Sequence, residues 1–213
     1  MSRNDSTDES GSQSIAVDDV LDEERLAPLR SFSWGRGILT GALSFVVGYL
    51  LMAALFFVGP PSIDAQSLSG RFDQIAYIFY NSQFVDGLIS APADVTIPGG
   101  RRFNFVLEAT EPAVPIVVYL SIPVVSVLVI GGLFQAVVRS DVDEYVDAGL
   151  TGAAMALGYV AVALVGTFLI ARSTGNGIAT FAPDRIQTVV LCVAYPFVLG
   201  TLGALGGLMI DRE

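Results

Sequence analysis

Four long apolar stretches dominate the pattern of hydrophobic and polar positions along this chain. They cover about residues 37–58, 113–138, 148–171 and 186–210, and none of them contains Asp, Glu, Lys, Arg or His. A helix needs about 20 apolar residues to cross a hydrocarbon core of about 30 Å. A soluble protein of 213 residues could not cover four such helices on all sides. The pattern therefore predicts an all-α membrane protein, a bundle of four transmembrane helices that makes several passes through the cell membrane.

The long connection between the first two spans, residues 59–111, contains a helical pattern of its own. Apolar residues recur at the spacing of one helical face at Leu68, Phe72, Ile75 and Phe79. Polar residues occupy the opposite side of the same helix. The spacing predicts an amphipathic helix that lies on the bilayer surface or caps the bundle.

Later in the same connection, apolar and polar residues alternate in 94–98 and again in 102–107. Gly99 and Gly100 separate the two runs, so the pattern predicts a small β-hairpin. We therefore expect a structured loop between the first two spans of an otherwise helical protein.

The N-terminal residues and the arginines bear on orientation. Residues 1–35 are rich in Ser, Asp and Glu, which predicts a disordered acidic tail before a transmembrane domain at 36–213. The arginines near the spans divide equally between the two sides of the membrane. Arg36 nevertheless abuts the first span, whose flanking charge usually dominates. Both termini are therefore predicted to be cytoplasmic, and the loop 59–111 external.

The spans also resemble one another in pairs. Residues 39–42 and 150–153 both read Leu-Thr-Gly-Ala, and a Gly-Tyr pair follows in each of these spans. The second and fourth spans each carry a mid-helix proline, Pro123 and Pro196, before a Gly-Gly-Leu run. These matches predict a duplicated helix hairpin whose copies are parallel about an axis along the membrane normal. Chance similarity of Gly-, Ala-, Val- and Leu-rich helices is the alternative.

Small residues and prolines in the spans are candidate packing or hinge positions. Small residues four apart let helix backbones approach closely, and a proline removes a backbone hydrogen bond and kinks its helix. Packing is favoured over a gating role. The candidates are Gly41, Gly48, Tyr49, Pro123, Gly152, Gly158, Tyr159, Pro196, Gly203 and Gly207.

The charge balance indicates the habitat more than a partner. There are 21 acidic residues against 11 basic ones, and every basic residue is Arg. Such an acidic surface suits molar salt, where screening removes its self-repulsion. It excludes nucleic acid as a partner, since phosphate binding needs a basic patch. With one cysteine, Cys192, and no His, neither a metal nor a cofactor is expected.

The spans contain no marker of a specific chemistry. Proton relays and charged-substrate sites in membranes normally include an ionisable residue, and these spans have none. We interpret the aspartates at the span borders as solvated adaptations to salt; they are Asp141, Asp143, Asp147 and Asp184.

No Ser or Cys has a base near it in the sequence, so an enzyme is not expected. The favoured function is a non-catalytic membrane scaffold or accessory subunit that binds a membrane-protein partner or a second copy of itself. The alternative is a small transporter or channel subunit for a neutral or small solute, working as an oligomer.

Two segments carry a resemblance to a known family. Residues 77–85 read Tyr-Ile-Phe-Tyr-Asn-Ser-Gln-Phe-Val, and residues 195–207 begin with Tyr-Pro and end with Gly-Ala-Leu-Gly-Gly. With the four-span plan, they resemble an uncharacterised family of haloarchaeal membrane proteins, from about Arg36 to the C-terminus. Its members are labelled hypothetical membrane proteins or transporters, so the resemblance implies no activity and no functional residues.

Within the first of these segments, three polar or aromatic residues are candidates for an external contact patch: Tyr77, Tyr80 and Asn81. The favoured alternative is that this segment is a loop helix packed against the bundle.

Overall fold

The computed structural model describes residues 28–58, 68–92, 94, 96–97, 101–108, 114–137, 144–174 and 177–210. Within them, four helices are long and apolar enough to cross a membrane. They are α3 (Trp34–Val58), α5 (Ile116–Val137), α6 (Glu144–Leu169) and α7 (Arg185–Ile210). The prediction of four such helices is confirmed.

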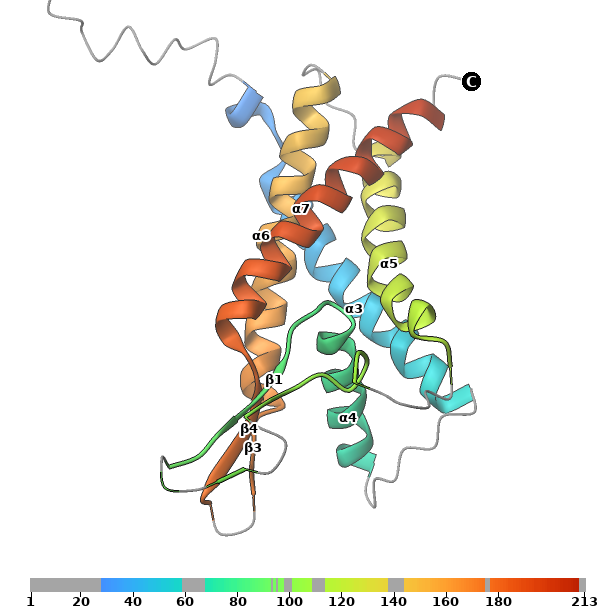
Figure 1. The fold of residues 1–213 in the computed structure, drawn as a ribbon. Coiled ribbons are helices and arrows are strands. Elements are labelled where there is room, and N and C mark those ends of the chain that lie inside the picture. Colours follow the sequence, from blue (N-terminus) through green and yellow to red (C-terminus); the bar gives the residue numbers. More distant parts are fainter. Residues whose placement is uncertain are drawn as a thin grey trace, which may run out of the picture.

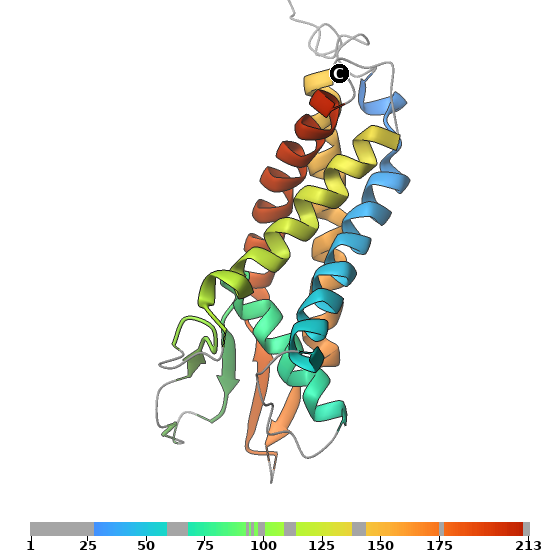
Figure 2. The same cartoon turned by 90° about the vertical axis from the view of Figure 1, so that its right-hand side faces the viewer.

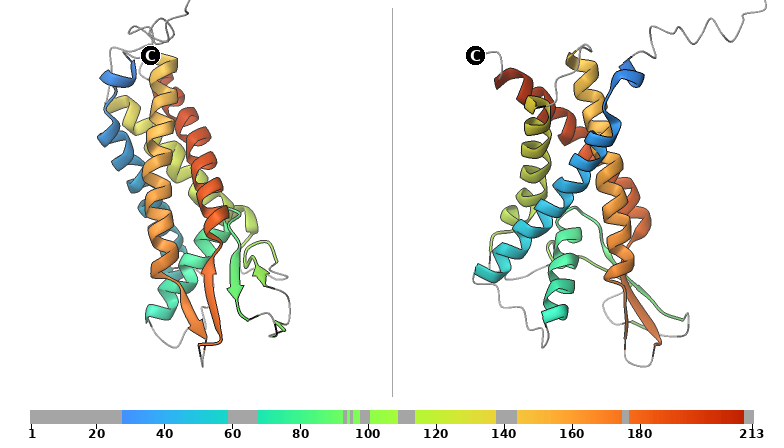
Figure 3. Two further views of the ribbon diagram at one scale, coloured as in Figure 1. Left: turned by 90° about the vertical axis from the view of Figure 1, so that its left-hand side faces the viewer. Right: turned by 180° about the vertical axis from the view of Figure 1, so that it is seen from behind.

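The four long helices form a ring in which α3 and α7 each pack on both α5 and α6. The beginning of α3 and the end of α7 lie at one end of the bundle, as expected for an even number of passes (Figure 1). Toward the opposite end the helices diverge, α3 and α5 to one side and α6 and α7 to the other (Figures 1 and 3). A bundle that opens in this way needs something to fill the opening.

Helix α4 (Leu68–Asn81) fills that opening. The predicted amphipathic helix is therefore present, and its apolar face is turned inward between the helices. Ile75 and Phe79 are fully buried and belong to one core with Met52 of α3, Val127 of α5 and Tyr159 of α6. The Phe79 ring meets Phe45 of α3 edge to face, with 5.1 Å between the ring centroids. The centre of the core is thus the place where α4 enters the bundle.

The protein is mostly helical, as predicted, but it is not all-α, because a four-stranded antiparallel sheet extends beyond the open end of the bundle (Figure 2). Its strands are β1 (Gly87–Ser90), β2 (Arg102–Phe103), β3 (Arg172–Thr174) and β4 (Ala179–Pro183), in the order β2-β1-β4-β3. The connection between α3 and α5 supplies β1 and β2, and the connection between α6 and α7 supplies the other two. The sheet therefore joins the two connections at this end.

The predicted β-hairpin is wrong in its pairing. Strand β2 does begin at Arg102, but it pairs with residues 87–88 rather than with 94–98. Of 94–98, the described residues 94, 96 and 97 are not in a strand, and the others lie outside the described residues. The partner β1 follows α4 directly and has β4 on its other side, with Gly87 opposite Pro183. A pairing partner about a hundred residues away is invisible to a local pattern.

Residues 28–33, which fall in the predicted disordered tail, are ordered against the bundle. Phe32 is buried and packs with Phe134 of α5 and Ala154 of α6. Its ring also meets Trp34 edge to face. The rest of the tail, residues 1–27, lies outside the described residues.

The candidate packing glycines lie where helix backbones cross closely. A Cβ at Gly41 would overlap the Met155 carbonyl of α6, and one at Gly158 would overlap the Ile38 carbonyl of α3. On α7, a Cβ at Gly207 would come within 2.5 Å of the Gly132 carbonyl oxygen of α5. In each case the obstacle is a neighbouring backbone that cannot move aside easily.

The remaining candidates from the spans are also inside the bundle. A Cβ at Gly48 would come within 2.9 Å of the Ser126 hydroxyl, and those at Gly152 and Gly203 would press on backbone atoms of α7 and α5. Pro123 and Pro196 are buried within continuous helices. Whether the two hairpins are copies of one another stays a prediction.

Candidate functional site

Helix α4 ends in a tight turn that reverses the chain inside the bundle. The Val85 N–H donates to the Tyr80 carbonyl at 3.1 Å and the Phe84 N–H to the Asn81 carbonyl at 3.0 Å. This pair of bonds is the Schellman arrangement, in which the residue after the cap adopts a left-handed conformation and is usually glycine. Here that residue is Phe84, with φ of 64°.

Phe84 carries backbone strain without a compensating burial of its ring. A left-handed conformation costs an L-residue about 1–2 kcal/mol, which glycine avoids. The Phe84 side chain is 48% exposed in the isolated chain, whereas Gln83 and Val85 on either side of it are buried. An outlier of this kind is a reason to suspect a role outside folding.

Gln83 places an amide among the long helices. Its Oε1 accepts a hydrogen bond from the Tyr159 hydroxyl of α6 at 2.7 Å, and the Cys192 thiol of α7 lies 3.7 Å from the same oxygen. Its Nε2 donates to the Phe79 carbonyl at 3.0 Å. All of these groups are buried, and Gln83 is only 1% exposed.

The depth of that amide follows from its partners. Cys192 is seven residues beyond the start of α7 at Arg185, and Tyr159 is ten residues before the end of α6 at Leu169. At a rise of about 1.5 Å per residue, the turn lies about 10–15 Å inside the sheet-side ends of these helices. Helix α4 and β1 therefore form a re-entrant hairpin, which enters the bundle and leaves on the same side.

Three further tyrosine hydroxyls fasten α4 to its neighbours. Tyr49 of α3 donates to the Phe72 carbonyl at 3.2 Å, and Tyr77 donates to the Ile170 carbonyl at 3.1 Å. Tyr80 donates to the Ala163 carbonyl of α6. Burial raises the pKa of Tyr77 to about 12, with a smaller contribution from the charge of Asp73.

The predicted external contact patch is therefore wrong as a surface. Tyr77, Tyr80 and Asn81 are all buried. The two tyrosines hold the helix in place, while Asn81 closes the turn by donating from Nδ2 to the Val85 carbonyl at 2.7 Å. Its Oδ1 also accepts the Phe105 N–H at 2.9 Å. These polar groups face inward because α4 has bundle helices beside it.

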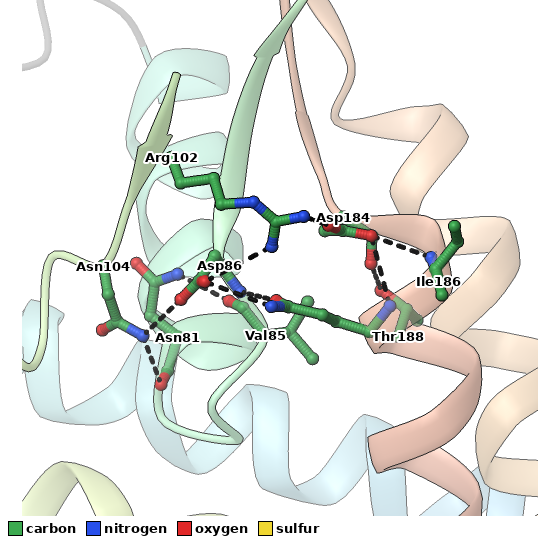
Figure 4. Close-up of polar contacts among 9 residues, drawn as sticks. Asn81, Val85, Asp86, Arg102, Asn104, Asp184, Ile186 and Thr188 are labelled. Carbon is green, nitrogen blue, oxygen red and sulfur yellow. Dashed lines mark hydrogen bonds and ion pairs between the residues drawn. The ribbon is translucent and has the colours of Figure 1, made fainter. Parts of the chain in front are cut away.

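A network of charged and amide side chains joins the sheet to the start of α7 (Figure 4). Asp184 caps that helix, since its Oδ1 accepts the Ile186 and Gln187 N–H groups at 2.9 and 3.2 Å. Its Oδ2 lies 2.9 Å from the guanidinium of Arg102 in β2. Asp184 is buried, so the interpretation of it as a solvated residue is wrong.

The same network continues to the α4 turn. The Asp86 N–H donates to Gln187 Oε1 at 2.8 Å, and Gln187 Nε2 donates back to Asp86 Oδ2 at 3.2 Å. Asn104 donates to Asp86 Oδ1 at 3.3 Å. Because the network joins β2, the residue before β1 and the start of α7, tilting the sheet against the bundle would break several part-buried hydrogen bonds.

The side chains that meet at this site supply hydrogen-bond donors and acceptors. Gln83, Tyr159 and Cys192 bring an amide, a hydroxyl and a thiol together, with no acid–base partner for the thiol among the described contacts. Within the described residues no group of three His, Cys, Asp or Glu side chains is placed to hold a metal ion. A hollow of about 270 Å³ beside Tyr80 is lined mainly by apolar residues of α3, α4 and α6.

Sequence reasoning missed the central member of the site, Gln83. The available signal was the run Asn81-Ser82-Gln83, three polar residues in a row within an otherwise aromatic and apolar segment. In a membrane bundle such a run has to find partners.

A family model matches residues 22–210. The chain belongs to the DUF7978 family, a family of unknown function. No curated protein and no solved structure matches it. The DUF7978 match spans all the described helices and strands, so the re-entrant hairpin and the sheet both lie inside the family region.

Proposed function

We propose that this DUF7978 protein is a multi-pass protein of the cell membrane that serves as a non-catalytic scaffold or accessory subunit. The observation that carries the proposal is the platform, by which we mean the sheet together with the α4 turn. Two connections far apart in sequence merge into this one surface, and the network around Asp86 and Asp184 fixes it to the helices. The acidic, Lys-free composition supports the proposal that the protein comes from an organism that lives in high salt.

Aromatic and apolar side chains around the α4 turn are exposed in the isolated chain, and because the turn lies inside the helix ends they would supply a contact surface within the membrane. Phe84 is half-exposed in a strained conformation, and Phe105, whose N–H bonds to Asn81, is 54% exposed. Leu107 is also exposed. Aromatic residues are enriched where proteins bind each other, and strain held at an exposed ring supports selection for contact. The partner would be another membrane protein or a second copy of this chain.

Photo-crosslinking in native membranes tests this proposal. We expect p-benzoyl-phenylalanine at position 84 or 105 to give a discrete protein adduct. The same probe at Met209, exposed on α7 at the opposite end of the bundle, is the matched control and should give none. An adduct at twice the mass of the chain would identify a second copy. Absence of a discrete adduct from both platform positions would contradict the scaffold function.

A small transporter or channel subunit is the second candidate, and one observation favours it. The Tyr195 hydroxyl is buried without a hydrogen-bond partner among the described residues, and it lies one turn after Cys192 on α7. A buried hydroxyl without a partner in the described part of the chain is suited to a small neutral solute. Liposome flux assays decide this candidate: it predicts flux that Gln83→Leu abolishes, and wild-type vesicles without flux of neutral solutes or ions would exclude it.

A further inference from the structure

Asp147 is a carboxylate buried at the end of the bundle opposite the sheet. It is the fourth residue of α6 and only 3% exposed, so its interpretation as a solvated border residue is wrong. Helix α6 begins at Glu144, one turn before the predicted span, so Asp147 lies within the helix. Its side chain is buried because it faces the last turn of α5.

Two buried polar side chains surround this carboxylate. Gln135 of α5 donates from Nε2 to Asp147 Oδ2 at 2.6 Å. Thr151, one turn further along α6, donates its hydroxyl to Gln135 Oε1 at 3.1 Å. The other carboxylate oxygen, Asp147 Oδ1, is buried and has no hydrogen-bond partner, and no ion pair is made by Asp147 within the part of the chain that the structure describes.

A lone buried carboxylate needs a compensating positive charge. An ionised group away from water is costly unless it is paired, and one amide does not neutralise it. Arg36 of α3, at the same end of the bundle, lines an apolar hollow with Phe134 and makes no ion pair with Asp147. Among the described residues, therefore, no arginine pairs with Asp147.

The atoms around Oδ1 suit a hard monovalent ion. Asp147 Oδ1 is a carboxylate oxygen left free by the described residues, and the Gln135 amide and Thr151 hydroxyl bonded beside it hold two further oxygens. The last turn of α5, which contains Gln135, is the negative end of a helix whose final carbonyls have no intrahelical partner. Helix ends of this kind coordinate Na⁺ in other membrane helix bundles. A single carboxylate balances one charge, whereas Ca²⁺ and other divalent ions usually take several carboxylates.

We infer that Asp147, Gln135 and Thr151 form a binding site for an alkali cation between α5 and α6. The cation would stabilise the closed end of the bundle by joining the two helices through Asp147 Oδ1. The site lies at the opposite end from the platform, so it is independent of the proposed scaffold function.

Thermal unfolding of the full-length protein in nanodiscs tests the site. NaCl or KCl is exchanged for choline chloride at a constant total chloride concentration, because choline is a quaternary ammonium ion much larger than Na⁺ or K⁺ and its methyl groups keep oxygen ligands away from the charge. A ligand that binds only the folded state raises Tm with concentration, and we expect a rise of about 5–10 °C near saturation. An equal Tm in choline and alkali salts would overturn the inference.

Variants assign the effect to Asp147. In Asp147→Asn, which keeps the size of the side chain but removes its charge, we expect the cation-dependent rise in Tm to disappear. The control is Asp73→Asn in α4, which removes an acid paired with Arg172 at the other end and should keep the full rise. A full rise in Asp147→Asn would overturn the inference.

A second variant covers the case in which Asp147→Asn does not fold. Thr151→Val keeps the shape of the side chain and removes one oxygen, so the rise in Tm should need about tenfold more cation. If Thr151→Val reaches half of its rise in Tm at the same cation concentration as the wild type, Thr151 is not part of the site and the inference is overturned. A wild-type Tm that depends on pH but not on the identity of the cation would assign the site to a proton and also overturn it.

Discussion

At the scale of single residues, the α4 turn separates two neighbouring side chains into different environments. Gln83 is buried against Tyr159 and Cys192, while the next residue, Phe84, holds a left-handed backbone and leaves its ring half-exposed. The first residue serves the packing of the turn. The second exposes an apolar ring at the depth of the turn inside the helix ends, where we propose that a membrane-protein partner contacts it.

Replacing Phe84 separates backbone strain from ring contacts. Phe84→Gly should leave the free energy of unfolding unchanged or raise it by up to about 1 kcal/mol, because glycine adopts φ of 64° freely. Phe84→Ala removes the ring but keeps the strain, so it should be about 1 kcal/mol less stable than Phe84→Gly. Equilibrium unfolding in mixed micelles measures both. A loss above about 2 kcal/mol in Phe84→Gly would mean that the ring is a packing element.

The contribution of the Tyr159 hydroxyl to stability can be compared with that of the Tyr49 hydroxyl, which also bonds to the α4 segment. Tyr159→Phe should lower the free energy of unfolding by about 1–3 kcal/mol, because Gln83 Oε1 then loses its 2.7 Å bond in a fully buried place. Tyr49→Phe removes a longer bond, to the Phe72 carbonyl at 3.2 Å near the exposed end, and should cost about 1 kcal/mol or less. Equal losses in the free energy of unfolding for the two variants would contradict the conclusion that the buried Tyr159–Gln83 bond contributes more than the Tyr49–Phe72 bond.

At the scale of elements, the long helices are predictable and the platform is not. Charge-free runs predict helix bounds to within a few residues. The reason is that the backbone of a long apolar segment in lipid has to satisfy its hydrogen bonds internally, which a helix does. The stripe through Ile75 and Phe79 predicts α4, since it reports helical spacing. Its insertion into the bundle and the pairing of β1 with β4 depend on residues from distant spans, for which no local pattern exists.

The packing of α5 on α7 can be tested with two adjacent glycines. Gly207→Ala should lower the free energy of unfolding by about 1–3 kcal/mol, because the new methyl group would come within 2.5 Å of the Gly132 carbonyl oxygen. Gly206→Ala meets no atom within 4 Å and should be neutral or stabilising by up to about 1 kcal/mol. Thermal unfolding of both variants measures the difference, and the reverse order would refute the α5–α7 crossing.

At the scale of the whole molecule, the two ends of the bundle differ in kind. One end is closed and holds the buried hydrogen bond between Gln135 and Asp147. The other end is open, filled by α4 and covered by the sheet. The start of α3 and the end of α7 are both at the closed end (Figure 1). If both termini are cytoplasmic, as Arg36 beside the first span suggests, the sheet of the platform faces the outside of the cell.

Cysteine labelling of intact cells tests that orientation. Ile178→Cys, exposed in the turn before β4, should react with a membrane-impermeant maleimide from outside. Met209→Cys, at the end of α7, should react only after lysis. The wild-type chain is the background control, since its Cys192 is buried and should stay unlabelled in both conditions. Labelling of Met209→Cys from outside, with Ile178→Cys protected until lysis, would place the termini outside and the sheet of the platform in the cytoplasm.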